Sequence, residues 1–278
     1  MVRGELERCG AVSESGRECE PGCYPPPVIT LPLELEDKGR VRILSLKRPE
    51  KKNAFDLALT ETLWSALEHA SEDPSIHVVV VTGFGDYFTA GADVNVFLGG
   101  AEGDITKIAR LYEPLRACKK TTFCAVNGPA IGMGVTILPS FDMVYAAETA
   151  TFMVPFMRLA LGVEYGGSHH LTRLIGHQRT RELILRGKPI DAGTAERWGL
   201  VNRVFAKDAL MSEVLAIAND IAAQPQGAVL ACRHVLDRGL EATFDQAVDE
   251  ENRVLSTRYG SEENQSAVMA FLASRKKS

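Results

Sequence analysis

The sequence lacks a long basic run, a long uncharged apolar stretch and an apolar secretory signal, which are typical of nucleic-acid-binding, membrane-spanning and secreted proteins respectively. Its 31 Lys and Arg are outnumbered by 36 Asp and Glu, and no long basic run occurs, so we expect neither a nucleic acid nor an anionic membrane as partner. No uncharged apolar stretch reaches the ~18 residues of a membrane span. The first ten residues carry acids where a secretory signal is apolar. Without a recognisable targeting signal we expect a cytoplasmic protein, and a peroxisomal or mitochondrial location stays open for a eukaryotic source.

Metal-binding patterns are also missing. The six cysteines are Cys9, Cys19, Cys23, Cys118, Cys124 and Cys232. The Cys19-x3-Cys23 spacing could be half of a zinc site, but no second Cys or His pair at ligand spacing follows it. His169 and His170 are adjacent, and neighbouring residues on a helix point in different directions, which favours packing over ligation. We therefore expect no metal site, and the cysteine usage fits free thiols in a reducing compartment.

Strand-like and helix-like segments alternate in the first two thirds of the chain. Residues 41–46 alternate like a strand. Residues 77–83 contain a continuous β-branched run of four valines and a threonine, typical of a strand buried on both faces of a parallel sheet. Apolar residues recur at helical spacing over residues 56–70, and a second helical stretch covers residues 105–118. This alternation predicts an α/β fold.

Three parts of the chain differ in composition. Residues 1–30 are polar and end in three prolines, which indicates a disordered or loosely attached leader. Residues 31–200 hold the predicted α/β core with the active site. Residues 201–278 read as a C-terminal helical region, because helical runs follow one another there with no strand between them, at 210–223, 226–238 and 243–258.

Two glycine-containing loops each follow a predicted strand, at residues 88–93 and 127–134. Ligands of parallel sheets bind at the carboxyl ends of strands, so both loops are expected to face one crevice. Peptide N–H groups converging from two such loops could bind an oxyanion, although tight connections are the commoner reason for glycine in such turns. No Gly-Lys-Ser/Thr follows, which excludes a phosphate loop.

Several motifs resemble the crotonase, or enoyl-CoA hydratase/isomerase, superfamily over about residues 33–275. In chain order they include Arg48-Pro49 with Asn53-Ala54, Phe88-Thr-Ala-Gly-Ala-Asp93 and Ala125-Val-Asn-Gly-Pro-Ala-Ile-Gly-Met-Gly134. The resemblance implies a ββα-spiral core, C-terminal helices that assemble a homotrimer or a dimer of trimers, and an acyl-CoA thioester substrate. It implies no cofactor apart from the CoA of that substrate. It also implies an oxyanion hole from the backbone N–H groups of Ala92 and Met133.

The acids of the superfamily differ between its branches. Hydratases of the family use two glutamates, and the corresponding positions here are Thr136 and Phe156, neither of which can activate a water as a carboxylate does. The single-glutamate 3,2-trans-enoyl-CoA isomerases of peroxisomal type resemble this chain more closely, with Pro155-Phe156 followed by Glu164. The resemblance implies that Glu164 is the catalytic base. Without it, Glu164 would read as a surface acid that favours the start of a helix, and Val163 stands where the family usually has Pro.

Other residues are predicted to bind CoA. Lys51 and Lys52 lie where the resemblance places the adenine nucleotide, and Arg275 and Lys276 lie in a terminal segment that can reach a CoA phosphate in the family. Two residues of the first loop, Ala90 and Asp93, are candidates for the same ligand, although Asp93 could instead anchor backbone N–H groups. The expected function is an enoyl-CoA isomerase. The alternatives are an enoyl-CoA hydratase, another crotonase activity, or a catalytically silent acyl-CoA-binding protein.

Overall fold

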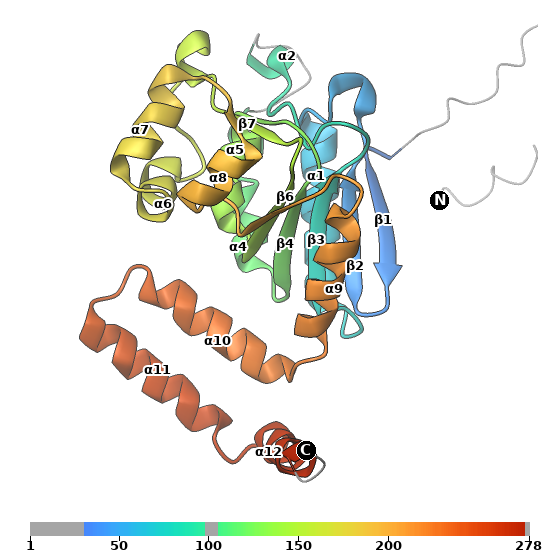
Figure 1. Cartoon of the computed structure of the whole chain (residues 1–278), viewed down its shortest axis with the longest axis vertical. Coiled ribbons are helices and arrows are strands. Elements are labelled where there is room, and N and C mark those ends of the chain that lie inside the picture. The colour runs from blue at the N-terminus through green and yellow to red at the C-terminus, as the bar shows by residue number, and fades with distance from the viewer. Residues whose placement is uncertain (1–30, 98–104, 276–278) are drawn as a thin grey trace, which may run out of the picture. The chain divides into compact units, whose positions relative to one another are not determined.

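The computed structural model describes residues 31–97 and 105–275, and Figure 1 shows their arrangement. The predicted leader at residues 1–30, with three of the six cysteines, lies outside the described residues, and so does Lys276. No helix among the described residues is long and apolar enough to cross a lipid bilayer. The described residues belong to one compact unit.

A six-stranded sheet forms the centre of this unit. Its strand order is β1 (Leu33–Lys38), β2 (Val41–Leu46), β3 (Val78–Gly83), β4 (Thr121–Val126), β6 (Met143–Ala147) and β9 (Arg203–Phe205). β1 pairs antiparallel with β2, and every later pair is parallel. A second, three-stranded sheet contains β5 (Ala130–Ile131), β7 (Thr151–Met153) and β8 (Ile190–Asp191). The predicted α/β class is therefore confirmed.

The burial of β3 on both faces explains the β-branched run in its sequence. All six residues are buried, and the side chains of its four valines alternate between two apolar clusters. Val79 and Val81 pack in the cluster that contains α1 (Leu57–Glu72), whereas Val78 and Val80 pack in the cluster that contains α9 (Leu210–Ala222). A strand with helices on both faces has no polar side, which is what the run at residues 77–83 predicts.

The remaining helices of the core are short. They are α2 (Val94–Phe97), α3 (Ile105–Ile108), α4 (Tyr112–Ala117), α5 (Met133–Thr136), α6 (Gly167–Leu174), α7 (His177–Arg186) and α8 (Ala192–Trp198), with 3-10 turns at Pro49–Lys51, Leu138–Ser140 and Phe156–Leu159. The helical stretch expected over residues 105–118 is interrupted, because α3 ends before α4 begins. Pro114 has no N–H to continue an earlier helix, and it is accommodated in the first turn of α4.

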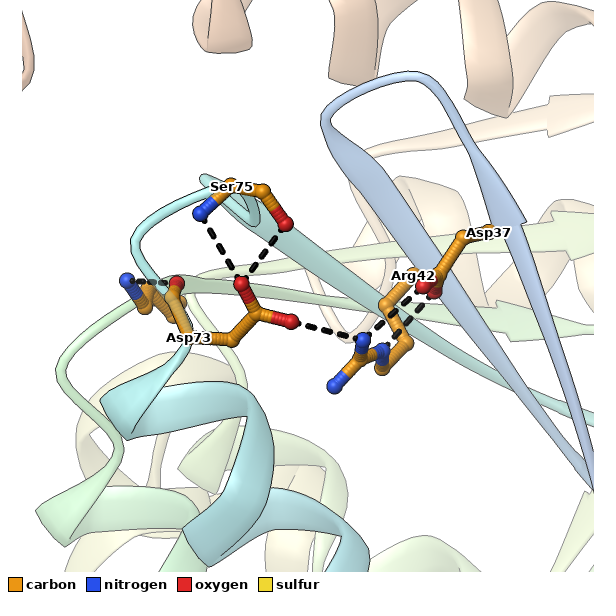
Figure 2. Close-up of polar contacts among 5 residues, drawn as sticks. Asp37, Arg42, Asp73 and Ser75 are labelled. Carbon is orange, nitrogen blue, oxygen red and sulfur yellow. Dashed lines mark hydrogen bonds and ion pairs between the residues drawn. The ribbon is translucent and has the colours of Figure 1, made fainter.

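An ion-pair cluster fastens the edge of the sheet to the end of α1 (Figure 2). The Arg42 guanidinium donates to both carboxylate oxygens of Asp37 at 2.8 Å and to Oδ2 of Asp73 at 2.9 Å. The other oxygen of Asp73 accepts from the backbone N–H and the hydroxyl of Ser75, at 2.9 and 2.6 Å. Hydrogen bonds from Arg42 lower the pKa of the Asp37 carboxyl. β1, β2 and the loop after α1 are thereby held together.

The predicted C-terminal region, residues 201–278, begins with the strand β9 and is helical from α9 onward. After α9 it continues with α10 (Gln226–Gly239), α11 (Phe244–Arg258) and α12 (Glu262–Arg275). α10 and α11 lie side by side, and none of the three helices has a buried residue (Figure 1). Arg233 joins α10 to the sheet, because its Nε donates to Oδ1 of Asp142 at 2.7 Å and its Nη1 donates to the carbonyls of Cys118 and Lys120. α9 instead packs on the main sheet, and the domain boundary at residue 200 stays a prediction.

Candidate active site

A pocket of about 280 Å³ lies where the two glycine-containing loops meet. One wall comes from the loop after β3 and from α2, a second from the loop between β5 and α5, and a third from the segment after β7. The lining residues are Ala90, Gly91, Ala92, Val94, Phe97, Ile131, Gly132, Met133, Pro155, Phe156, Leu159, Leu161, Gly162 and Glu164. Both loops therefore border one pocket, as the ends of parallel strands predict, and the pocket is almost entirely apolar.

In the first loop, one peptide N–H that borders the pocket has no acceptor among the residues that the structure describes. The flanking N–H groups donate to other parts of the chain at 2.8–3.2 Å, namely those of Thr89, Ala90, Gly91 and Asp93. The N–H of Ala92 donates to no acceptor within the described residues. Because peptide donors away from water are normally paired, a free one that borders a pocket is available to a ligand oxygen.

The second loop presents a similar feature. The N–H of Gly132 donates to the carbonyl of Met153 at 2.8 Å, whereas those of Met133 and Gly134, at the start of α5, have no acceptor in the part of the chain that the structure describes. The two loops touch at Gly91. A Cβ on Gly91 would lie 2.6 Å from the carbonyl oxygen of Ile131 and 3.6 Å from the nitrogen of Met133. Gly91 also has a φ of +88°, so glycine is needed for both reasons.

Glu164 is the one titratable residue among those that line the pocket in the described chain. Its side chain is half-buried, and burial raises the pKa of its carboxyl to about 7. The apolar neighbours, which include Phe156 and Leu161, offer the charged form little solvation. A carboxyl with a pKa near neutrality can both accept and return a proton at physiological pH.

Tyr165 is a site-bordering residue that the sequence reasoning did not single out. Its backbone adopts a left-handed conformation, with φ 55°, and its ring is buried. The hydroxyl donates to the carbonyl of Ile108 and lies 3.7 Å from the sulfur of Met133, and the ring meets Tyr112 edge-on at 6.3 Å. Burial, followed by the charge of Glu164, raises the pKa of the phenol. In the sequence, only its position directly after Glu164 indicated that Tyr165 would lie beside the site.

The two positions that carry glutamates in hydratases are apolar or neutral here. Phe156 lines the pocket and is buried. Thr136 is fully buried in α5 and is not among the lining residues, and its hydroxyl has no hydrogen-bond partner within the described chain. Neither position therefore brings a second carboxylate to the pocket.

The residues predicted to bind CoA are not gathered at the pocket. Of these, only Ala90 is among the lining residues of the described chain. Lys52 is exposed and holds its Nζ 5.0 Å from the centre of the Tyr87 ring. Lys51 is exposed in the neighbouring turn, and Arg275 lies in α12 with its guanidinium over a phenylalanine ring. Their contacts with CoA stay predictions.

Asp93 faces the chain itself. Its carboxylate lies 3.5 Å from the guanidinium of Arg48 and accepts from the N–H of Asn95 at 3.1 Å. It is buried, and it begins α2 in this way. This arrangement matches the anchoring alternative, and its predicted contact with CoA stays a prediction. No cluster of three His, Cys, Asp or Glu side chains suited to a metal occurs within residues 31–97 and 105–275.

The fold and the pocket together are those of an enzyme of the crotonase type, with two glycine-containing loops that meet beside a carboxyl group. The sequence model of the Enoyl-CoA hydratase/isomerase family matches residues 36–278, and the chain belongs to this family of enzymes that act on acyl-CoA substrates.

Its relatives include both activities in the family name. The chain is 33% identical over 246 residues to a "Probable enoyl-CoA hydratase" of Rhizobium meliloti (strain 1021), covering 88% of this chain and 96% of that protein. It is 32% identical over 272 residues to "Enoyl-CoA delta isomerase 2" of Homo sapiens, covering 95% of this chain and 69% of that protein. Among solved structures, an enoyl-CoA hydratase from Bacillus anthracis matches with a TM-score of 0.83 at 27% identity, over 87% of this chain and 96% of that chain.

Proposed function

We propose that this protein is an enoyl-CoA isomerase that converts a 3-enoyl-CoA into the trans-2-enoyl-CoA. The observation that carries the proposal is the single carboxyl of the pocket, Glu164, among otherwise apolar lining residues of the described chain. One group that can take and return a proton is sufficient for moving a double bond. Hydration needs a group that activates a water, and the hydratase positions here hold Thr136 and Phe156.

The reaction balances with one proton carrier. The Glu164 carboxylate removes a proton from C2 of the substrate, the C2–H electron pair forms the C2–C3 double bond, and the C3–C4 pair takes the proton back at C4. Between the two transfers, negative charge develops on the thioester oxygen. The N–H groups of Ala92 and Met133 are the donors proposed for that oxygen. No separate cofactor is required, because electrons and proton stay within the substrate and Glu164.

The apolar lining supports this chemistry in two ways. It raises the pKa of Glu164 to about 7, which strengthens the carboxylate as a base and leaves the acid able to return its proton. It also offers few polar groups to hold a water near the dienolate. Phe156 is part of this lining, in the place where a hydratase carries an acid.

Hydration is the second candidate, and the names of several relatives favour it. Besides the Rhizobium meliloti protein, the "2,3-dehydroadipyl-CoA hydratase" of Escherichia coli (strain K12) is 32% identical over 248 residues. A silent acyl-CoA-binding protein is the third. The second candidate needs a water-activating group other than Thr136 or Phe156.

The test compares two substrates and two matched variants. Wild-type protein is expected to convert 3-hexenoyl-CoA into trans-2-hexenoyl-CoA and to add little water to crotonyl-CoA. Glu164→Gln is expected to lower kcat about 10³-fold or more, because it removes the base without changing side-chain size. Glu213→Gln, an exposed glutamate of α9, is the control and should leave kcat unchanged. Isomerisation that survives Glu164→Gln, or rapid hydration of crotonyl-CoA, would refute the proposal, and thioester binding without either reaction would favour the silent protein.

A further inference from the structure

Thr89 connects the two loops of the pocket through its backbone. Its N–H donates to the carbonyl of Pro129 at 3.2 Å, and its carbonyl accepts from the N–H of Ile131 at 3.0 Å. Pro129 and Ile131 belong to the second loop, whereas Thr89 precedes Ala92 by three residues in the first. The two loop segments that lead to the N–H groups of Ala92 and Met133 are therefore hydrogen-bonded to each other at Thr89.

The side chain of Thr89 continues this connection. Its hydroxyl donates to the carbonyl of Asn53 at 2.7 Å and accepts from the N–H of Gly91 at 3.1 Å. Its methyl group lies against Gly134 of α5, where an added Cβ would come within 2.4 Å of it. Thr89 is fully buried, so both halves of its side chain are used within the protein.

Asn53, whose carbonyl accepts from the Thr89 hydroxyl, is held in place by its own hydrogen bonds. Asn53 is fully buried with φ 56°, and its amide donates to the carbonyls of Phe84 and Tyr87 at 2.9 and 2.8 Å. Its side-chain oxygen accepts from the N–H of Arg48 at 2.9 Å. Asn53 therefore gives the hydroxyl of Thr89 a fixed partner outside the two loops, and the hydroxyl in turn fixes the N–H of Gly91, next to Ala92.

We propose that Thr89 is a positioning residue that sets the direction of the Ala92 N–H and its separation from the Met133 N–H. The proposal rests on the proposed function, in which these two donors bind the thioester oxygen. Donors act on a developing oxyanion only within a narrow range of distance, and misplacement by about 1 Å can lower a rate about 10²-fold. The Thr89 hydroxyl should therefore affect the transition state more than the binding of the substrate.

Two substitutions separate the hydroxyl from the methyl group. Thr89→Val keeps the shape and removes the hydroxyl, and it is expected to lower kcat for 3-hexenoyl-CoA about 10- to 100-fold with KM changed less than about 3-fold. Thr89→Ser keeps the hydroxyl and should stay within about 5-fold of wild type. Thr180→Val is the matched control, because Thr180 is also buried and its hydroxyl donates to a backbone carbonyl, that of Gly176, at 2.9 Å. It should lower Tm but leave kcat unchanged.

The proposal is overturned if Thr89→Val keeps the wild-type kcat while its Tm falls, since the hydroxyl would then act on stability alone. It is also overturned if Thr89→Ser loses as much activity as Thr89→Val. Should the valine variant not fold, Thr89→Ala against Thr89→Ser makes the same comparison, and a serine rate at least about 10-fold above the alanine rate is the supporting result.

A spectroscopic measurement distinguishes this proposal from the proposed function. Saturated hexanoyl-CoA has no double bond to move, and its thioester carbonyl stretch should shift to lower frequency when bound to wild-type protein and to Thr89→Ser. The shift should be smaller in Thr89→Val. If the three proteins show these shifts but wild type does not isomerise 3-hexenoyl-CoA, the proposed function fails and the positioning role stands. An equal shift in all variants would refute the positioning role.

Discussion

The α/β core and the C-terminal helices of this protein bury their apolar residues to very different extents. In the core, β3 and β4 are buried along their whole length and are packed between helices. In α10, α11 and α12 no residue is buried, and large side chains such as Leu255 and Phe271 are more than 60% exposed. The core therefore forms its pocket within one chain, whereas large apolar residues of the C-terminal helices stay exposed among the residues that the structure describes.

This difference separates two roles. Every lining residue of the pocket in the described chain precedes α6, so the proposed chemistry belongs to the core. Exposed apolar surface of the kind seen on α10–α12 is typical of association surfaces. The homotrimer or dimer of trimers that the family resemblance implies stays a prediction, and the C-terminal helices are where we expect its contacts.

The largest effect is expected from removing the ion pair that joins α10 to the core. Arg233→Met removes the partner of Asp142, whose side chain is only 17% exposed, and loss of one member of such a pair costs about 3 to 5 kcal/mol. Hydrogen exchange measured by mass spectrometry should show protection in α10 falling about 100-fold or more, while β3 keeps its protection. Equal loss in β3 would mean that the two regions unfold as one cooperative unit.

A matched pair of leucines sharpens the comparison. Leu63→Ala in α1 empties a fully packed position and should lower the free energy of unfolding by about 3 kcal/mol. Leu255→Ala in α11 removes a side chain that is 62% exposed and should cost less than about 0.5 kcal/mol in a dilute monomer. Chemical denaturation at several protein concentrations measures both. A cost for Leu255→Ala that grows with concentration would show that another copy covers it.

A smaller effect is expected at the edge of the core. Arg42→Met removes three hydrogen bonds to Asp37 and Asp73 and should lower the free energy of unfolding by about 2 kcal/mol. Because the cluster lies away from the pocket residues, kcat for 3-hexenoyl-CoA should not change. A changed kcat with unchanged stability would contradict the separation between this edge and the site.

The smallest effects are those of pH, and two glutamates should show them with opposite sign. The pKa of Glu164 in the core is raised to about 7 by burial, so its contribution to stability is present below its ordinary pKa and is lost as the pH rises through 7. The pKa of Glu250 in α11 is lowered to about 2 by Arg253 and His234, so its contribution is present at neutral pH and is lost as the pH falls toward 2.

Denaturation curves of Glu164→Gln and Glu250→Gln against pH test this. The first variant should gain stability relative to wild type above pH 7, and the second should lose it there. In the wild type, kcat/KM for 3-hexenoyl-CoA should rise with pH around 7, as the carboxylate forms. An activity profile flat between pH 5 and 9 would exclude Glu164 as the base.

Part of this molecule could be predicted from the sequence. The run at residues 77–83 predicted a strand covered on both faces, and the glycines at residues 88–93 and 127–134 predicted two loops at strand ends. Glu164 was different: the residues alone favoured a surface acid, and only the family resemblance indicated a base. Its partial burial and raised pKa come from side chains such as Phe156 that are near it only in the fold.

The rest depends on contacts between distant residues, which periodicity does not encode. Arg233 pairs with Asp142 across 91 residues, and the carbonyl of Asn53 meets the hydroxyl of Thr89 across 36. Tyr165 adopts a left-handed backbone that no propensity favours for tyrosine, because the surrounding packing imposes it. Local patterns predicted the helices and strands, whereas hydrogen bonds between distant residues determine how the loops at their ends are placed.

The central claim is that one carboxyl carries the proton from C2 to C4. It is tested most directly with 3-hexenoyl-CoA that carries two deuterium atoms at C2, converted in ordinary water and analysed by NMR. A single-glutamate shuttle in an apolar pocket predicts product with deuterium at C4, because the proton removed is returned before it exchanges fully with solvent. Product whose C4 carries only hydrogen from water would contradict the account.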